Sequence, residues 1–136
     1  MPPQTPDALL LSLKRGELHP VYYLTGPEDV LKDEATRQII EAALDPSLRD
    51  FNLDQRAAPQ LDPDGLHSLL NTPPMMAERR VVLLREVEGL KKKPRVHAVL
   101  DAYLARPSPD TVLVMIQGSG EEKADAELAR RSMAVD

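Results

Sequence analysis

Two unbroken apolar runs constrain the fold of this chain more than any other feature. Residues 81–84 read Val-Val-Leu-Leu and residues 112–116 read Val-Leu-Val-Met-Ile. Continuous apolar runs are typical of strands that are covered on both faces, whereas strands with one solvated face alternate apolar and polar residues. These two runs therefore predict central strands of a sheet that carries helices on both sides.

The rest of the chain alternates between strand and helix patterns. The predicted strands are residues 21–24, 49–54, 79–86 and 112–116, and residues 134–135 could begin a fifth. The predicted helices are residues 7–13, 28–44, 62–70, 96–104 and 121–131. This order predicts an α/β fold of three layers, with a mainly parallel sheet between helices. Because the sequence stops as a strand begins, we expect residues 1–136 to be one domain of a longer protein.

Composition narrows the classes of function. Hydrophobic residues make up 42% and charged residues 29%, which is typical of a globular domain. The absence of Cys excludes disulfides, zinc ribbons and thiol nucleophiles, and the net charge of −5 argues against a general nucleic-acid coat. Neither a secretory signal nor a membrane-length apolar run is present, so we expect a cytoplasmic protein. The histidines and serines form no metal-binding or nucleophile pattern, so we predict neither a metal nor a catalytic residue.

The loop after the first predicted strand matches a phosphate-binding loop only in part. Such loops read G-x-x-x-x-G-K-[ST]. Gly26 and Lys32 occupy the first glycine and the lysine positions, but Leu31 replaces the second glycine and Asp33 replaces the hydroxyl residue. The Leu side chain obstructs the approach of phosphate to the backbone, and the hydroxyl that would ligate magnesium is missing. We therefore predict a degenerate nucleotide site and no nucleotide cofactor.

The third predicted strand departs from the ATPase pattern independently. Arg85 and Glu86 follow its apolar run, at the place where an ATPase carries the Asp that holds magnesium. Glu28 and Asp29 add negative charge where a triphosphate would lie, and like charges ~4 Å apart repel by about 1 kcal/mol even in bulk water. Either the fold has lost a nucleotide site or it never had one. Both interpretations predict no ATP hydrolysis.

Four segments, in order along the chain, resemble bacterial DNA polymerase III delta subunits. They are residues 20–29 (PVYYLTGPED), 49–54 (RDFNLD), 70–82 (LNTPPMMAERRVV) and 106–114 (RPSPDTVLV). The resemblance implies the nucleotide-binding fold of AAA+ proteins with an eroded ATP site. It also implies a part in the clamp loader, where the delta subunit binds one protomer of the ring-shaped sliding clamp and holds an interface open during DNA replication. The other clamp-loader subunits are then further partners, and the family's lid and collar domains fall outside residues 1–136.

The resemblance also implies where the clamp is bound. In this family an exposed hydrophobic pair, on a short helix before the third strand, inserts into a pocket of the clamp. By position the pair is Met75 and Met76, where better-known members have Leu and Phe. Pro73 and Pro74 precede it and can neither continue a helix nor pair in a central strand, which indicates a projecting connection. Met is flexible and suits a partner's groove, although a Met pair can also belong to the core.

Two alternatives to a clamp-binding domain stay open at this stage. One is a small α/β nucleotide-binding enzyme with an unusual phosphate loop, and the other is a structural clamp-loader domain without clamp contact. The basic run of residues 91–95 (KKKPR) is either a solvated loop or a weak, indirect contact with primer-template DNA.

Overall fold

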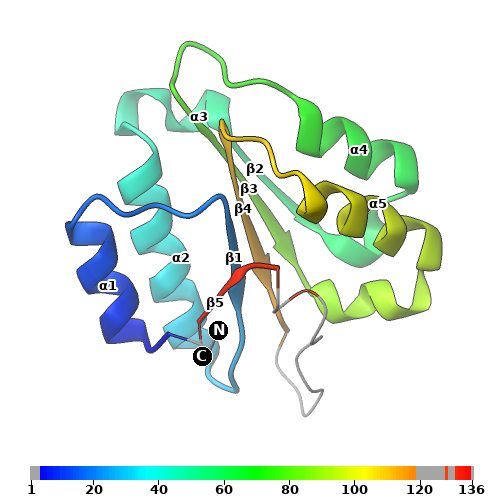
Figure 1. Ribbon diagram of the computed structural model, residues 1–136, viewed down its shortest axis with the longest axis horizontal. Coiled ribbons are helices and arrows are strands. Elements are labelled where there is room, and N and C mark those ends of the chain that lie inside the picture. The colour runs from blue at the N-terminus through cyan, green and yellow to red at the C-terminus, as the bar shows by residue number, and fades with distance from the viewer. Residues whose placement is uncertain (1–3, 119–127, 129–130, 136) are drawn as a thin grey trace.

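A five-stranded parallel sheet forms the centre of the computed structural model, which describes residues 4–118, 128 and 131–135 (Figure 1). The strands lie in the order β2-β3-β4-β1-β5, and all neighbouring strands pair in parallel. Their bounds are Val21–Leu24 (β1), Leu53–Ala57 (β2), Arg80–Arg85 (β3), Thr111–Ile116 (β4) and Met133–Val135 (β5). The predicted parallel sheet is confirmed, and the fifth strand that residues 134–135 could begin is present beside β1.

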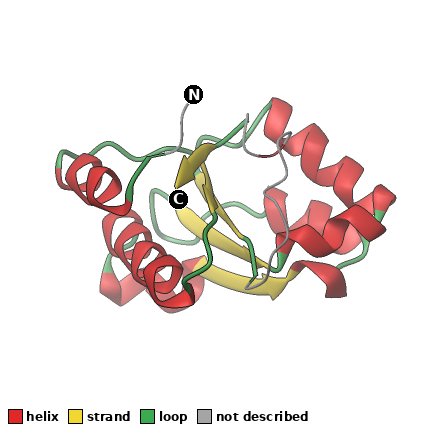
Figure 2. Ribbon diagram, turned by 90° about the horizontal axis from the view of Figure 1, so that it is seen from below, coloured by secondary structure: helices red, strands yellow, loops and turns green. Residues whose placement is uncertain are grey.

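Helices cover both faces of this sheet. Their bounds are Pro6–Lys14 (α1), Asp29–Ala43 (α2), Arg49–Asn52 (α3), Pro63–Asn71 (α4) and Pro94–Ala105 (α5), with 3₁₀ turns at Pro46–Leu48 (η1), Ala58–Gln60 (η2) and Val87–Lys92 (η3). Seen along the sheet, α1 and α2 lie on one side, and α4 and α5 lie on the other (Figure 2). The predicted arrangement of three layers is confirmed.

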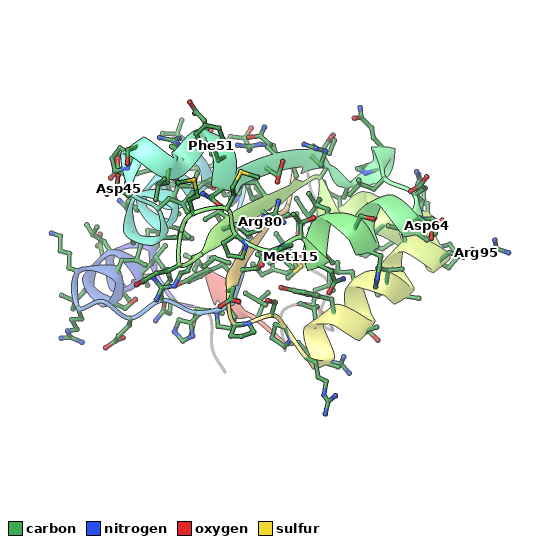
Figure 3. The ribbon with its side chains drawn as sticks, turned by 90° about the horizontal axis from the view of Figure 1, so that it is seen from above. Asp45, Phe51, Asp64, Arg80, Arg95 and Met115 are labelled. Atoms are coloured by element: carbon green, nitrogen blue, oxygen red, sulfur yellow. The ribbon has the colours of Figure 1, made fainter. Side chains whose placement is uncertain are left out.

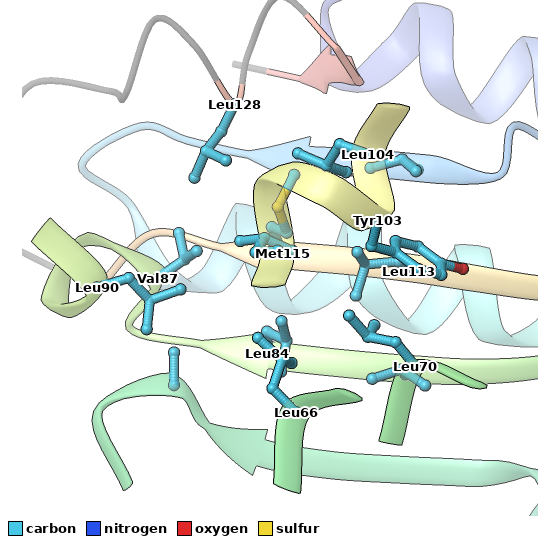
Figure 4. Close-up of a cluster of buried hydrophobic side chains, with 14 of the residues drawn as sticks. Leu66, Leu70, Leu84, Val87, Leu90, Tyr103, Leu104, Leu113, Met115 and Leu128 are labelled. Atoms are coloured by element: carbon cyan, nitrogen blue, oxygen red, sulfur yellow. The ribbon is translucent and has the colours of Figure 1, made fainter. Parts of the chain in front are cut away.

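The core is divided by the sheet into two clusters of buried side chains. Val81 and Leu83 of β3 point to the cluster under α1 and α2, whereas Val82 and Leu84 point to the cluster under α4 and α5. Figure 4 shows the second cluster, in which Leu66 of α4 packs near Leu84. Each fully buried aliphatic side chain contributes about 1.5–3 kcal/mol. The unbroken apolar runs are thus explained by burial on both faces.

The N-cap residues of two helices are those that the sequence predicts. The Thr5 hydroxyl accepts a hydrogen bond from the Ala8 N–H (3.1 Å) at the start of α1. The Asp62 carboxylate accepts one from the Gly65 N–H (2.6 Å) at the start of α4. In both helices Pro occupies the first turn, where its missing N–H leaves no bond unmade.

The prediction of a strand over residues 49–54 is wrong. Residues Arg49–Asn52 form α3, and β2 begins only at Leu53. The Asp45 carboxylate caps the preceding turn by accepting from the Ser47 N–H (2.9 Å), and the chain continues from that turn into a helix. Phe51 is consequently 68% exposed rather than half-buried. Alternation over so few residues suits a single helical turn as well as a strand.

The predicted helix over residues 121–131 falls mostly outside the described residues. No helix in the described part of the chain is long and apolar enough to cross a membrane.

Candidate functional site

The two predicted sites lie at opposite ends of the sheet. In a parallel sheet the loops that follow strands meet at one end, and the loops that precede strands meet at the other. Gly26 follows β1 and Glu86 follows β3, so the residues of the predicted degenerate nucleotide site are at the carboxyl end. Met75 and Met76 precede β3 and lie at the amino end, where the connection from α4 extends beyond the sheet (Figure 1).

At the carboxyl end, Lys32 is already engaged by protein groups. Its side chain is only 4% exposed, and Nζ donates to the backbone oxygen of Gln117 at 2.7 Å. Nζ also lies 3.2 Å from Asp29 Oδ1. A phosphate-binding lysine must present its ammonium group to the ligand. Here the ammonium group instead ties the start of α2 to the end of β4.

The substituted positions pair with each other. Arg85 Nη1 lies 3.5 Å from Asp33 Oδ1, and both side chains are partly or largely exposed. Exposed ion pairs of this kind contribute at most about 1 kcal/mol to stability. At the two positions where the ATPase pattern would have a magnesium-binding hydroxyl and carboxylate, this chain has a carboxylate and a guanidinium that attract each other.

The hollows at this end do not suit a nucleoside triphosphate. The hollow beside Leu31 and Gly26 is mainly apolar and has a volume of about 90 Å³, against about 300–1,000 Å³ for typical ligand pockets. The adjoining hollow has about 300 Å³, and its lining includes four acidic residues (Asp29, Asp33, Glu86 and Glu88) against two basic ones, Lys32 and Arg85, which are both paired with carboxylates. Glu88 is fixed there, since both its oxygens accept from the Gly118 N–H at 2.9 Å. Within the described residues, no group of three or more acidic or histidine side chains could hold a metal ion.

At the amino end, Met75 and Met76 lie in the connection between α4 and β3, which we call the methionine loop (residues 72–79). Met75 is 57% exposed and Met76 is 87% exposed, so neither belongs to the core. The loop consists of bends and contains no helix, so the short helix that the resemblance implies is absent. Pro73 and Pro74 stop α4 from continuing into the loop, because adjacent prolines do not continue a helix.

The backbone of Met76 is held in an unusual conformation. Its φ of 57° lies in the left-handed region, which costs a non-glycine residue roughly 1–2 kcal/mol. Residues in such conformations persist only where the surrounding structure holds them, and they cluster at functional sites.

Buried polar side chains hold the methionine loop and the start of the strand that follows it. In the middle of the loop, the amide of Asn52 contacts the backbone of Met75, with the Met75 N–H donating to Oδ1 (2.7 Å) and Nδ2 donating to the Met75 oxygen (2.9 Å). Directly after the loop, Arg80 is 3% exposed, donates to the Leu69 oxygen of α4 (2.5 Å) and forms an ion pair with Asp54 of β2. Asn52 lies in the strand predicted over residues 49–54, and no local pattern indicates its contact with the loop, because the contact joins residues 23 positions apart.

Other apolar groups lie near this end of the sheet. Phe51 is exposed at the edge of the molecule, next to Asn52 on α3 (Figure 3). An open hollow of about 560 Å³ is lined by Met76, by Ala43, the buried Leu44 and Leu48 around η1, and by the charged residues Asp45, Glu78 and Arg79. Exposed large apolar side chains gathered in one place are typical of a protein-binding surface.

The basic run is split by the structure. Lys93 Nζ donates a hydrogen bond to the backbone oxygen of Pro59. This bond joins the end of η3 to η2. Lys91 and Lys92 are exposed at the carboxyl end of the sheet, and Arg95 is exposed on α5. The contact of this run with DNA stays a prediction.

Comparison with known proteins gives a consistent set of similarities. Residues 22–130 match the family model described as DNA polymerase III, delta subunit. The DNA polymerase III subunit delta of Bacillus subtilis (strain 168) is 36% identical over 114 residues, which cover 77% of this chain and 32% of that protein. The solved structure of the Bacillus subtilis DNA clamp loader delta protein superposes with a TM-score of 0.82 and 28% identity, covering 96% of this chain and 41% of the other.

A more distant structure shares the fold alone. It is a DNA polymerase III gamma subunit-related protein of Thermotoga maritima, with a TM-score of 0.68, 14% identity, and coverage of 96% of this chain and 45% of that one. The chain thus spans less than half the length of each of these relatives.

Proposed function

The chain belongs to the DNA polymerase III delta subunit family, and from this premise we propose that it is the domain through which a clamp loader grips the DNA sliding clamp. The contact is made by Met75 and Met76, which enter a hydrophobic pocket of the clamp, with Pro73 and Pro74 at the base of the methionine loop. The observation that supports this most directly is the exposure of both Met side chains on a loop whose backbone is held at Met75 by the buried amide of Asn52.

The domain contributes to clamp opening only through the free energy of its binding to the clamp. Burial of each Met side chain contributes about 1.5–3 kcal/mol. A bound partner shifts a conformational equilibrium only by its difference in affinity for the two states. The methionine loop therefore helps to open the ring only if the hydrophobic pocket of the clamp binds the two Met side chains more tightly in the open ring than in the closed ring.

The domain works without a nucleotide cofactor and has no ATPase activity. The engagement of Lys32 by Gln117, the Arg85–Asp33 pair and the acidic hollow beside them support this part of the proposal. ATP-driven steps then fall to the other clamp-loader subunits, which are the further partners of this protein in the cytoplasm.

The decisive experiment measures clamp binding by surface plasmon resonance. We expect the double variant Met75→Ala with Met76→Ala to lose at least about 100-fold in affinity, which corresponds to about 3 kcal/mol. Its far-ultraviolet circular dichroism should not change, because both side chains lie outside the core.

The matched control is Val30→Ala. Val30 is 77% exposed but lies at the opposite end of the sheet, so its truncation should leave clamp affinity unchanged. Unchanged affinity of the folded double Met variant would refute the proposed contact and leave a structural clamp-loader domain as the function. The variant Met75→Leu with Met76→Phe restores the pair of the better-known members and should bind at least as well as the natural chain.

A further inference from the structure

The structure assigns a positioning role to Asn52: its side chain holds the methionine loop in the conformation that presents Met75 and Met76 to a partner. This inference rests on the proposed function for the identity of the partner. The conformation of the loop can be tested independently of the clamp.

Asn52 is fully buried, and the hydrogen bonds of its side chain all go to backbone groups. Oδ1 accepts from the Met75 N–H (2.7 Å), and Nδ2 donates to the Met75 oxygen (2.9 Å) and to the Leu48 oxygen (3.0 Å). One amide thus bonds to both the N–H and the carbonyl of a single residue, as a neighbouring strand would. This pairing fixes the orientation of the Met75 peptide groups relative to α3.

The chemistry of these contacts requires an amide on a short side chain. Two donors and one acceptor are used, and only Asn and Gln offer both kinds of group on a planar amide. Asp would keep the acceptor but would place its second oxygen against the carbonyls of Leu48 and Met75. Leu has a similar volume and offers neither donor nor acceptor.

The fixed residue directly precedes the strained one. Met76 has a left-handed backbone and an 87% exposed side chain, and neither feature stabilises the folded state of the domain on its own. Because strained conformations persist only where their surroundings hold them, we assign the restraint to the Asn52 contacts at Met75. If the loop is released, only a fraction of molecules presents the pair correctly, and apparent affinity falls in proportion to that fraction.

Hydrogen–deuterium exchange tests the positioning role directly. We expect Asn52→Asp to speed exchange in residues 72–79 by about tenfold or more, because at least one hydrogen bond of the loop is lost. Exchange in β3 and β4 should stay as in the natural chain. Asn52→Ala, which removes all three hydrogen bonds without adding a charge, should speed loop exchange at least as much and serves as the second variant should Asn52→Asp fail to fold.

Clamp affinity links the loop conformation to function. Asn52→Asp should weaken clamp binding by about tenfold through the loss of loop order. The same substitution in the Met75→Ala, Met76→Ala background should have no further effect on binding, since there is then no pair to present. A general loss of structure would instead speed exchange throughout the sheet.

The outcomes separate the two proposals. Unchanged exchange of residues 72–79 in both folded Asn52 variants would overturn the positioning role. Faster exchange in the loop, together with clamp affinity that does not depend on the Met pair, would keep the positioning role and refute the proposed clamp contact.

Discussion

Replacement of Lys32 by Met tests whether this lysine serves the fold or a ligand. The side chain is 4% exposed and its ammonium group contacts the Gln117 oxygen at 2.7 Å and Asp29 at 3.2 Å. Met has a similar length and keeps the apolar packing of the stem. The substitution therefore removes the charge and its hydrogen bonds with little change in volume.

The expected loss of stability follows from these contacts. The charge-assisted hydrogen bond to a buried carbonyl contributes about 1.5–3 kcal/mol. The ion pair adds less than about 1 kcal/mol, because Asp29 is 62% exposed. Relief from burying an ammonium group offsets part of the loss. We expect Lys32→Met to lower the free energy of unfolding by about 1–3 kcal/mol, and to lower Tm by about 3–5 °C per kcal/mol.

Urea unfolding followed by circular dichroism measures the stability, and isothermal titration calorimetry measures ATP binding. The natural chain and Lys32→Met should both show no ATP binding, while the unfolding midpoint falls only in the variant. Lys91→Met is the matched control, because Lys91 is exposed and its replacement should leave the midpoint unchanged. Micromolar ATP binding by the natural chain that Lys32→Met abolishes, with unchanged stability, would refute the reasoning and make Lys32 a phosphate ligand.

Two further predictions concern other buried polar groups. Arg80→Met should lower the free energy of unfolding by about 2–4 kcal/mol, because it leaves the Leu69 oxygen and the partly exposed Asp54 carboxylate without their donor. In a double-mutant cycle by urea unfolding, Asp54→Asn should then cost less in the Arg80→Met background than alone, and additive costs would contradict the pairing. Burial raises the pKa of the Tyr22 hydroxyl, although its hydrogen bond from the His19 N–H acts in the opposite direction. The contribution of this group to stability should be complete below the unfolded pKa of about 10 and lost as pH rises through the higher folded pKa. Urea midpoints between pH 8 and 11 should therefore fall more steeply for the natural chain than for Tyr22→Phe, and parallel curves would contradict this.

Much of the fold was predictable because its signals lie between neighbouring residues. The apolar runs before Arg85 and Gln117 indicate doubly covered strands, and Asp62 with the proline after it marks the start of α4. The error at residues 49–54 has the same origin. A local alternation around Phe51 was the only signal there, and it does not distinguish a strand from the single turn of α3.

The candidate sites were predictable in their residue types but not in their contacts. The sequence indicates that Lys32 stands in a degraded phosphate loop, and only the structure shows that its ammonium group bonds to a carbonyl 85 residues away. Likewise, the resemblance identifies Met75 and Met76, whereas their exposure and the left-handed backbone of Met76 are properties of the folded loop.

The sequence by itself determined the α/β class, the starts of α1 and α4, the positions of Gly26 and of the Met pair relative to the strands, and the departures from the ATPase pattern. These depend on side-chain chemistry and on spacing along the chain. Tertiary structure alone decided that the ammonium group of Lys32 bonds to the Gln117 oxygen, and that the amide of Asn52 meets the backbone of Met75. The physical reason is that a hydrogen bond between residues 23 positions apart forms only when parallel strands and their crossovers bring the two segments together, and no local pattern records that approach.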